Sequence, residues 1–345
     1  MRRLVASVVA RGSLPILARL DPERAHDLGL AGLRLLQPWW PAIEVPAQLA
    51  VRCLGLNFAH PLGLAAGFDK NGDYLDALGA LGFSHIELGT VTPRQQPGNP
   101  KPRMFRLSAT GALVNRMGFN NKGVDHLLAQ LARSRYAGIR GISIGKNFDT
   151  PIESAAADYL VCLRKVYAQA DYIAVNVSSP NTARLRELQE RDGLQRLVGA
   201  LQQERLSLET RHGKHVPLLV KIAPNLVPEQ IASLAATLRS LGVEGVIATN
   251  TSNDLTSLGP WPEAHRGGLS GAPLHAMSVS VIRQLRADLG PNFPIIGVGG
   301  IVSADHALAT LRAGANLIQI YTGFAYRGYR LVEEILNALV RLQSA

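Results

Sequence analysis

The chain has 345 residues, of which 47% are hydrophobic and 18% charged, and its formal net charge is +10. This composition allows a large buried core, so a disordered chain is excluded. The basic surplus favours anionic partners such as nucleic acid, phosphate ligands or an acidic membrane surface. The two cysteines, Cys53 and Cys162, have neither a metal-ligand spacing nor a disulfide framework, which fits a reducing compartment.

The basic surplus lies in two segments. Residues 1–20 contain four arginines, residues 88–124 contain six cations, and neither segment contains an acid. These ten residues are Arg2, Arg3, Arg11, Arg19, Arg94, Lys101, Arg103, Arg106, Arg116 and Lys122. No apolar run reaches the roughly 18–20 residues of a membrane span. The run Leu4–Ala10 is short and is ended by Arg11, so we do not expect a secretion signal.

The first 60 residues differ from the remainder of the chain. Residues 4–20 are apolar and basic, and Asp21-Pro22-Glu23 then predicts a helix start, with a cap, a proline and an acid in the first turn. We expect this helix to end before Pro38 or Pro41. One side of it carries Ala25, Leu28, Leu35 and Trp39. Packing on the rest of the protein and contact with a membrane interface both fit this pattern.

From about residue 61, short apolar runs alternate with amphipathic stretches of helical length. The eight runs are Leu62–Gly67, His85–Thr90, Gly141–Lys146, Tyr172–Ser178, Leu218–Ala223, Gly245–Asn250, Ile295–Gly300 and Leu317–Thr322. The helices expected between and after them are Asp73–Leu81, Gly123–Arg135, Glu153–Gln169, Gly193–Arg211, Pro228–Leu241, Ala276–Leu289, Ser303–Ala313 and Tyr329–Leu342. Continuous apolar strands indicate a parallel sheet buried on both faces. The pattern therefore predicts an α/β protein with a (β/α)8 (TIM) barrel. A doubly wound sheet is the alternative, although no G-x-G-x-x-G opens a helix after a strand.

Polar residues follow several of the predicted strands, where a barrel builds its active site. The chain has seven lysines against 29 arginines, yet Lys70, Lys146 and Lys221 lie in or directly after apolar runs. A lysine at such a place supplies a compact, movable charge, unless it merely extends into solvent. Four asparagines at the same rim suit a planar ligand with alternating donors and acceptors, such as a pyrimidine, although asparagine is also a common turn residue. They are Asn115, Asn176, Asn181 and Asn250.

The last two strand ends are rich in glycine, and acid–base candidates are few. Gly297–Gly300 and Tyr321–Gly323 occupy the positions where barrels frequently bind phosphate. No His, Asp and Glu cluster has a metal-ligand spacing. Ser179 is the most plausible reactive hydroxyl, but a serine is a poor base without a proton acceptor, so a structural role fits equally well.

Motifs spread along nearly the whole chain resemble those of one enzyme family. They include LDPERAH (20–26), AAGFDKNG (65–72), GNPKPRMFRL (98–107), NRMGFNN (115–121), VNVSSPNT (175–182), VKIAPN (220–225), GGLSG (267–271), GVGGI (297–301) and IYTG (320–323). Together, in this order, they resemble dihydroorotate dehydrogenase of the membrane-associated, quinone-dependent class.

The resemblance implies a barrel that holds FMN and oxidises dihydroorotate to orotate in pyrimidine biosynthesis. It implies that Ser179 is the base that removes the C5 proton, while the C6 hydride passes to the flavin N5. Cytosolic classes have a cysteine as this base, so the serine favours the quinone-linked class. The implied substrate-binding residues are Lys70, Asn115, Arg116, Met117, Gly118, Phe119, Asn176, Asn181, Asn250 and Thr251.

The resemblance also implies a flavin site, with Lys221 stabilising charge on the reduced flavin and the phosphate at the last two loops. The implied flavin contacts are Ala66, Gly67, Phe68, Asp69, Lys70, Thr90, Ser143, Asn176, Lys221, Thr249, Gly271, Gly300, Tyr321 and Thr322. Ser143 departs from the family, which commonly has an asparagine there, and its shorter hydroxyl reaches the flavin less readily.

The N-terminal helices resemble the mouth of a quinone tunnel, with His26, Arg106 and Tyr321 as polar groups near its inner end. The resemblance thus implies a membrane and quinone segment at 1–45 and a catalytic barrel at 46–345. We expect a peripheral protein, a monomer, on the cytoplasmic side of the bacterial inner membrane, without nucleic-acid binding. Two other classes remain open, a barrel lyase or aldolase with a Schiff base at Lys221 or Lys70, and a non-catalytic membrane-bound ligand carrier.

Overall fold

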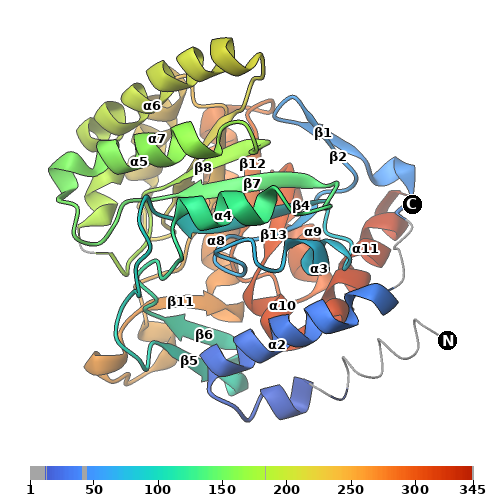
Figure 1. Ribbon diagram of the computed structural model, residues 1–345. Coiled ribbons are helices and arrows are strands. Elements are labelled where there is room, and N and C mark those ends of the chain that lie inside the picture. Colours follow the sequence, from blue (N-terminus) through green and yellow to red (C-terminus); the bar gives the residue numbers. More distant parts are fainter. Residues whose placement is uncertain (1–11, 13, 41–44, 183, 344–345) are drawn as a thin grey trace.

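Eight parallel strands close into a barrel in the computed structural model, which describes residues 12, 14–40, 45–182 and 184–343 (Figure 1). The strands follow the chain order around the barrel, and the last pairs with the first, with Ile318 opposite Leu62. They are β3 (Leu62–Leu64), β4 (His85–Val91), β7 (Ile139–Ile144), β8 (Tyr172–Asn176), β9 (Leu218–Ile222), β10 (Gly245–Ala248), β12 (Ile295–Val298) and β13 (Leu317–Ile320). The predicted TIM barrel is confirmed, and closure excludes the doubly wound sheet.

Helices surround the barrel, and each predicted helix is present to within a few residues. They are α3 (Leu75–Gly79), α4 (Val124–Leu131), α5 (Ala155–Val166), α6 (Arg191–His212), α7 (Pro228–Ser240), α8 (His275–Leu289), α9 (Ala304–Arg312) and α11 (Tyr329–Gln343). A further short helix, α10 (Thr322–Arg327), follows the last strand directly. It was not expected, because the predicted apolar run ended at Thr322 and residues 324–328 were assigned to no helix or strand.

The alternation of side chains along each strand produces two apolar layers. Outward residues such as Ile86, Ile142 and Val220 pack against the helices in the main core. Inward residues such as Leu219 and Ile247 form a second cluster inside the barrel. The hairpin β1 (Val51–Cys53) and β2 (Leu56–Phe58) adds Cys53, Leu54 and Phe58 to this inner cluster and so closes the amino-terminal end.

The helix predicted after Asp21 is α2 (Pro22–Leu36), and the Asp21 side chain accepts a hydrogen bond from the Arg24 amide at 3.0 Å. The structure divides its apolar residues between two environments. Ala25 and Leu30 are buried, whereas Leu28, Leu35 and Trp39 are exposed. Packing on the barrel is therefore observed, and a separate apolar set stays in solvent. Within the described ranges, no helix is long and apolar enough to cross a bilayer.

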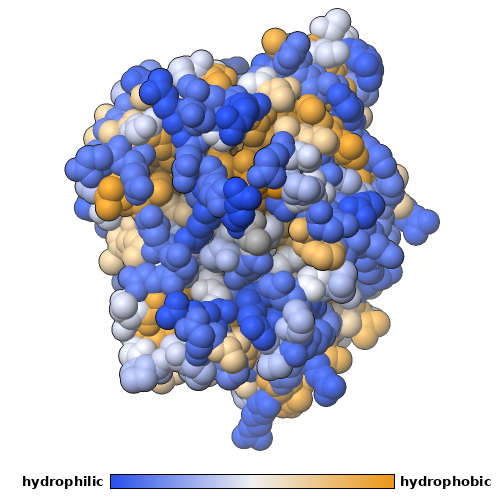
Figure 2. Space-filling view, turned by 90° about the vertical axis from the view of Figure 1, so that its left-hand side faces the viewer, coloured by the Kyte–Doolittle hydropathy of each residue, from blue (hydrophilic) through white to orange (hydrophobic). Residues whose placement is uncertain are grey.

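A small antiparallel sheet, β5 (Met104–Leu107), β6 (Ala112–Asn115) and β11 (Gly268–Gly271), was not expected from the sequence. Its middle strand pairs with segments from the loops after β4 and β10, and Gly268 lies opposite Asn115. The pairing of β6 with β11 leaves no local pattern because the two strands are far apart in the chain, whereas β5 and β6 form a hairpin joined by residues 108–111. The face that carries these loops is mostly hydrophilic, with separate hydrophobic patches (Figure 2).

The six cations of residues 88–124 mainly bind other groups of the same chain. Lys101 and Arg103 both contact Glu23 on α2. Arg106 donates to backbone carbonyls of the segment that precedes α2. The other three pairs are Arg94 with Asp149, Lys122 with Asp73, and Arg116 with the carbonyl of Pro102. These charges thus join loops and α2 to the barrel. Arg2, Arg3 and Arg11 lie outside the described residues.

Candidate active site

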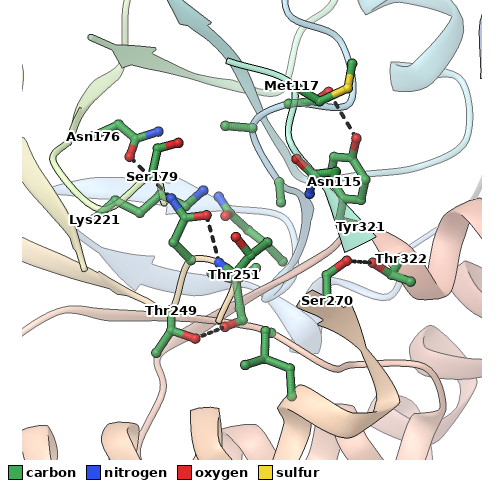
Figure 3. Close-up of a pocket in the computed structure, with 18 of the residues that line it drawn as sticks. Asn115, Met117, Asn176, Ser179, Lys221, Thr249, Thr251, Ser270, Tyr321 and Thr322 are labelled. Carbon is green, nitrogen blue, oxygen red and sulfur yellow. Dashed lines mark hydrogen bonds between the residues drawn. The ribbon is translucent and has the colours of Figure 1, made fainter. Parts of the chain in front are cut away.

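A pocket of about 980 Å³, counting its open mouth, lies at the carboxyl ends of the barrel strands (Figure 3). Most of the predicted site residues line it. They are Ala66, Gly67, Lys70, Thr90, Asn115, Met117, Gly118, Phe119, Asn176, Ser179, Asn181, Lys221, Thr249, Asn250, Thr251, Gly271, Gly300, Tyr321 and Thr322. Side chains from distant strands meet here because parallel strands of a barrel end at one rim.

Four of the residues predicted to bind substrate or flavin do not line this pocket. The Asp69 carboxylate accepts hydrogen bonds from the amides of Asn71, Asp73 and Tyr74, so it shapes the loop after β3. Arg116 points to the carbonyl of Pro102 at the surface.

The other two are Ser143 and Phe68. The Ser143 hydroxyl is buried and lies 2.8 Å from that of Thr90, which in turn accepts a hydrogen bond from the Asn176 amide at 2.8 Å. Ser143 therefore contacts the pocket through Thr90. Phe68 packs edge-on against Tyr321 and faces a second cavity.

The four asparagines form two hydrogen-bonded pairs. The Asn250 amide donates to the Asn176 carbonyl oxygen at 3.3 Å and to the Ser178 hydroxyl at 3.0 Å. The Asn181 amide donates to the Asn115 carbonyl oxygen at 3.3 Å. Each pair keeps further donors and acceptors on the pocket wall, since a primary amide has two donors and two acceptor positions. The arrangement can bind a planar, polar ring.

Ser179 lies in the loop after β8 and is 94% buried, with a relative exposure of 6%. Its hydroxyl oxygen accepts a hydrogen bond from the Asn181 backbone amide at 3.2 Å. Such a donor favours negative charge on the oxygen. In the described part of the chain, no ionisable side chain is hydrogen-bonded to this hydroxyl.

Lys70 and Lys146 occupy different environments. The Lys70 ammonium donates to the Gly67 carbonyl at 2.9 Å beside the pocket. Burial lowers the pKa of Lys70 to about 8, although the Glu23 carboxylate acts in the opposite direction. Lys146 instead donates to the carbonyls of Asn147 and Thr150 and lies away from the pocket. Only the first can therefore contact a ligand here.

A charged group lies beneath the pocket floor and was not among the predicted site residues. The Lys221 ammonium lies 3.2 Å from the carboxylate of Glu87 on β4. The same carboxylate accepts hydrogen bonds from Tyr172 at 3.2 Å and Gln319 at 2.9 Å. A glutamate and a glutamine inside otherwise apolar strands, HIELGTV and LIQI, were the available signal.

The loops after β12 and β13 provide backbone amides. Gly299, Gly300, Thr322 and Gly323 line the pocket, and the last two open α10, where amides lack an acceptor within the helix. A Cβ at Gly300 would collide with the backbone of His275, so only glycine fits. These amides and the Thr322 hydroxyl suit a phosphate group.

A second, mainly apolar cavity of about 1430 Å³ lies between α2 and the barrel. Its lining includes the predicted tunnel residues His26, Arg106 and Tyr321. Burial, followed by the nearby Lys70 charge, lowers the pKa of His26 to about 4, so its imidazole is neutral near pH 7. Tyr321 lines both cavities and is their shared wall.

Comparisons with known proteins agree with this geometry. The dihydroorotate dehydrogenase family model matches residues 48–342. A Pseudomonas aeruginosa (strain UCBPP-PA14) protein named dihydroorotate dehydrogenase (quinone) is 51% identical, covering 95% of this chain and 97% of that protein. A Chromobacterium violaceum protein of the same name is 52% identical, covering 96% and 97%.

Solved structures give the same answer. The DHODH of Eimeria tenella in complex with ferulenol superposes with a TM-score of 0.86 at 36% identity, covering 94% of this chain and 92% of that one. The ligand-free structure from the same organism gives 0.85. The chain belongs to the dihydroorotate dehydrogenase family, in its quinone-dependent class.

Proposed function

We propose that this protein oxidises (S)-dihydroorotate to orotate with a quinone as electron acceptor, in pyrimidine biosynthesis. The observation that carries the proposal is the pair of cavities that share Tyr321. One is polar and rich in amide side chains, and the other is apolar and lies under α2. A polar substrate and an apolar acceptor can thus bind on either side of one redox group.

The redox group is a flavin, and we propose FMN. The donors fit it, because glycine amides at the last two strand ends suit a phosphate and the buried Lys221 ammonium lies at the pocket floor. When bound, a flavin would supply the acceptor for the C6 hydride of dihydroorotate and the two electrons that the quinone needs. Residues proposed to hold it are those of the predicted flavin set that line the pocket, with Ser143 acting through Thr90.

The pyrimidine ring is proposed to bind between the two asparagine pairs. Their amides present both donors and acceptors, which matches the alternating N–H and C=O groups of the ring. The Lys70 ammonium is the cation proposed to hold the substrate carboxylate. Arg116 does not share this task, because its side chain points to the surface.

Ser179 is proposed as the base that takes the C5 proton. Its position on the pocket wall, its burial and the amide of Asn181 that donates to its oxygen support this role. The amide lowers the cost of negative charge on the oxygen as the proton moves. The C5 proton goes to the serine oxygen while the hydroxyl proton of Ser179 leaves to water in the open pocket, and the C6 hydride leaves with both bonding electrons.

The quinone is proposed to enter the apolar cavity from the side of α2. Neutral His26 can hydrogen-bond a quinone oxygen without burying a second charge. Tyr321 lines the same cavity, and its hydroxyl donates to the Gly67 carbonyl at 3.3 Å. Arg106 is proposed as a third polar group there. Its guanidinium also holds the carbonyls of Ala18 and Leu20, at 2.7 and 3.2 Å.

We further propose that residues 1–45 rest on a membrane and that 46–345 form the catalytic domain. Exposed Leu28, Leu35 and Trp39 support this, since tryptophan and leucine favour the membrane interface. The proposed location is the cytoplasmic face of the inner membrane, and the proposed state is a monomer. Flotation with anionic vesicles and light scattering test these two points.

The experiment that tests the activity uses the purified full-length protein. A visible flavin spectrum, bleached by dihydroorotate and restored by a quinone with formation of orotate, is the expected result. A colourless protein that forms a borohydride-trapped adduct on lysine would instead identify a Schiff-base enzyme. A flavin-loaded protein that forms no orotate overturns the proposal.

A further inference from the structure

Four polar side chains meet inside the barrel, directly below the pocket. Glu87, on β4, is fully buried, and its carboxylate is the centre of the group. One oxygen lies 3.2 Å from the Lys221 ammonium. The other accepts hydrogen bonds from the Tyr172 hydroxyl at 3.2 Å and the Gln319 amide at 2.9 Å.

The members of this group divide into two layers. Lys221 and Gln319 line the pocket, whereas Glu87 and Tyr172 do not and lie beneath them. Tyr172 belongs to the inner apolar cluster, so the layer below is apolar. A buried carboxylate needs hydrogen-bond donors to offset the loss of water around it, and here three donors surround it.

The hydrogen bonds orient the Gln319 amide. Its nitrogen donates to Glu87 and, at 3.1 Å, to the Tyr172 oxygen. Burial, together with the Glu87 charge, raises the pKa of Tyr172 well above its usual range, so its hydroxyl keeps its proton and donates to Glu87. The amide oxygen of Gln319 is therefore directed away from Glu87.

That oxygen is buried and has no hydrogen-bond partner among the described residues. A buried, unpaired carbonyl oxygen costs about 1–3 kcal/mol. Because Gln319 lines the pocket, a ligand bound there can supply a donor to this oxygen. The pocket floor thus presents one cation, Lys221, and one acceptor, Gln319, both held from below by Glu87.

We propose that Glu87 is a positioning residue that sets the electron affinity of the flavin, by partly neutralising Lys221 and by directing the Gln319 oxygen at a ligand N–H. This inference rests on the proposed function, because it requires a flavin in this pocket. A reduced flavin carries more negative charge than an oxidised one, so a neighbouring cation favours reduction. The Glu87 anion opposes that effect and so lowers the potential of the flavin.

The test is the midpoint potential of the flavin in Glu87→Gln, measured by equilibration with a reference dye at pH 6. Loss of the anion is expected to favour the reduced flavin at least tenfold. For a two-electron couple this is a positive shift of about 30 mV or more. If the equilibrium ratio of reduced to oxidised flavin lies within threefold of that in the wild-type protein, the inference is overturned.

Tyr172→Phe is the matched control, because it removes one hydrogen bond to Glu87 but neither charge, and Tyr172 does not line the pocket. In this variant, the equilibrium ratio of reduced to oxidised flavin is expected to differ less than threefold from that of the wild-type protein. A shift as large as that of Glu87→Gln would mean that packing, rather than charge, controls the potential, and would also refute the inference.

A third variant keeps the inference testable if Glu87→Gln does not fold. Gln319→Leu removes the unpaired amide oxygen of Gln319 and is expected to weaken flavin binding to the apoprotein at least tenfold. Unchanged flavin affinity would contradict the role of this oxygen as an acceptor. Failure of this inference can be told apart from failure of the proposed function. A wild-type protein that binds no flavin refutes the proposed function. If dihydroorotate reduces the flavin of the wild-type protein but the midpoint potential of Glu87→Gln is unchanged, only the role of Glu87 is refuted.

Discussion

The carboxylate of Glu23 joins α2 to the barrel, and replacing it with glutamine should release the helix. Glu23 accepts two hydrogen bonds from Arg103, at 2.7 and 3.1 Å. The two side chains are only 12% and 7% exposed. Removing one partner of such a buried pair costs about 3–5 kcal/mol, because the remaining charge is left without compensation. Glutamine keeps one acceptor, so we take the lower limit of about 3 kcal/mol.

A loss of about 3 kcal/mol should make local opening of α2 about 100-fold more frequent than in the wild-type protein, since about 1.4 kcal/mol corresponds to a tenfold change in an equilibrium constant. Hydrogen–deuterium exchange of the peptide that covers Pro22–Leu36 measures it. Quinone-dependent turnover should fall with it, because α2 forms one wall of the apolar cavity. Reduction of the flavin by dihydroorotate should persist.

Lys101→Met is the matched control for this prediction. Lys101 contacts the same carboxylate at 3.3 Å, but its side chain is 64% exposed. An exposed ion pair contributes about 0–1 kcal/mol, so α2 should open less than about fivefold more often. Equal effects of the two variants, or less than tenfold faster exchange in Glu23→Gln, would refute the reasoning.

The pH dependence of this contact has a definite sign. Burial alone would raise the pKa of Glu23, but the hydrogen bonds and charges of Arg103 and Lys101 lower it below its ordinary value of 4.5. The contribution to stability is therefore complete above about pH 4.5 and is lost as the pH falls through the lowered pKa.

Three further predictions concern the two cavities. Ser179→Ala should slow flavin reduction by about 10²–10⁴-fold in stopped-flow measurements while the affinity for dihydroorotate changes little, and an unchanged rate excludes this base. Because burial lowers the pKa of Lys70 to about 8, orotate affinity should fall up to tenfold per pH unit above pH 8. In Lys70→Met this dependence should disappear from titrations of the flavin absorbance, and its persistence would assign it elsewhere. Arg106→Leu should raise the KM for quinone but leave flavin reduction intact, since Arg106 lines only the apolar cavity; steady-state assays with varied quinone separate the two effects.

Much of the barrel could be predicted because its signals are local. Strands such as Tyr172–Asn176 are apolar on both faces, and the helices between them repeat their apolar residues along one side. The position of Ser179, Asn250 and Thr322 at one rim follows from the same pattern, because parallel strands in a barrel all end on one side. The cap at Asp21 is also local and is present as expected.

Other features depend on partners that the chain order does not reveal. The strand Ala112–Asn115 pairs with Gly268–Gly271, and Arg103 pairs with Glu23, 80 residues away. Long cationic side chains can reach many carboxylates. The sequence therefore showed that residues 88–124 carry a basic surplus, but it did not show that these cations bind other groups of the same chain. Only the folded chain selects one partner for each.

The sequence by itself determined the barrel and its active rim, because strand alternation and strand ends are properties of neighbouring residues. Most residues on the pocket wall, and the place of Tyr321 in both the flavin and the quinone sets, followed from the resemblance of the motifs to one family. The tertiary structure alone decided two other matters. It divided the apolar residues of α2 between a buried and an exposed set, and it placed Glu87 under Lys221 and Gln319. The physical reason is the same in each case, since burial and electrostatic pairing depend on distances between residues that are remote in the chain.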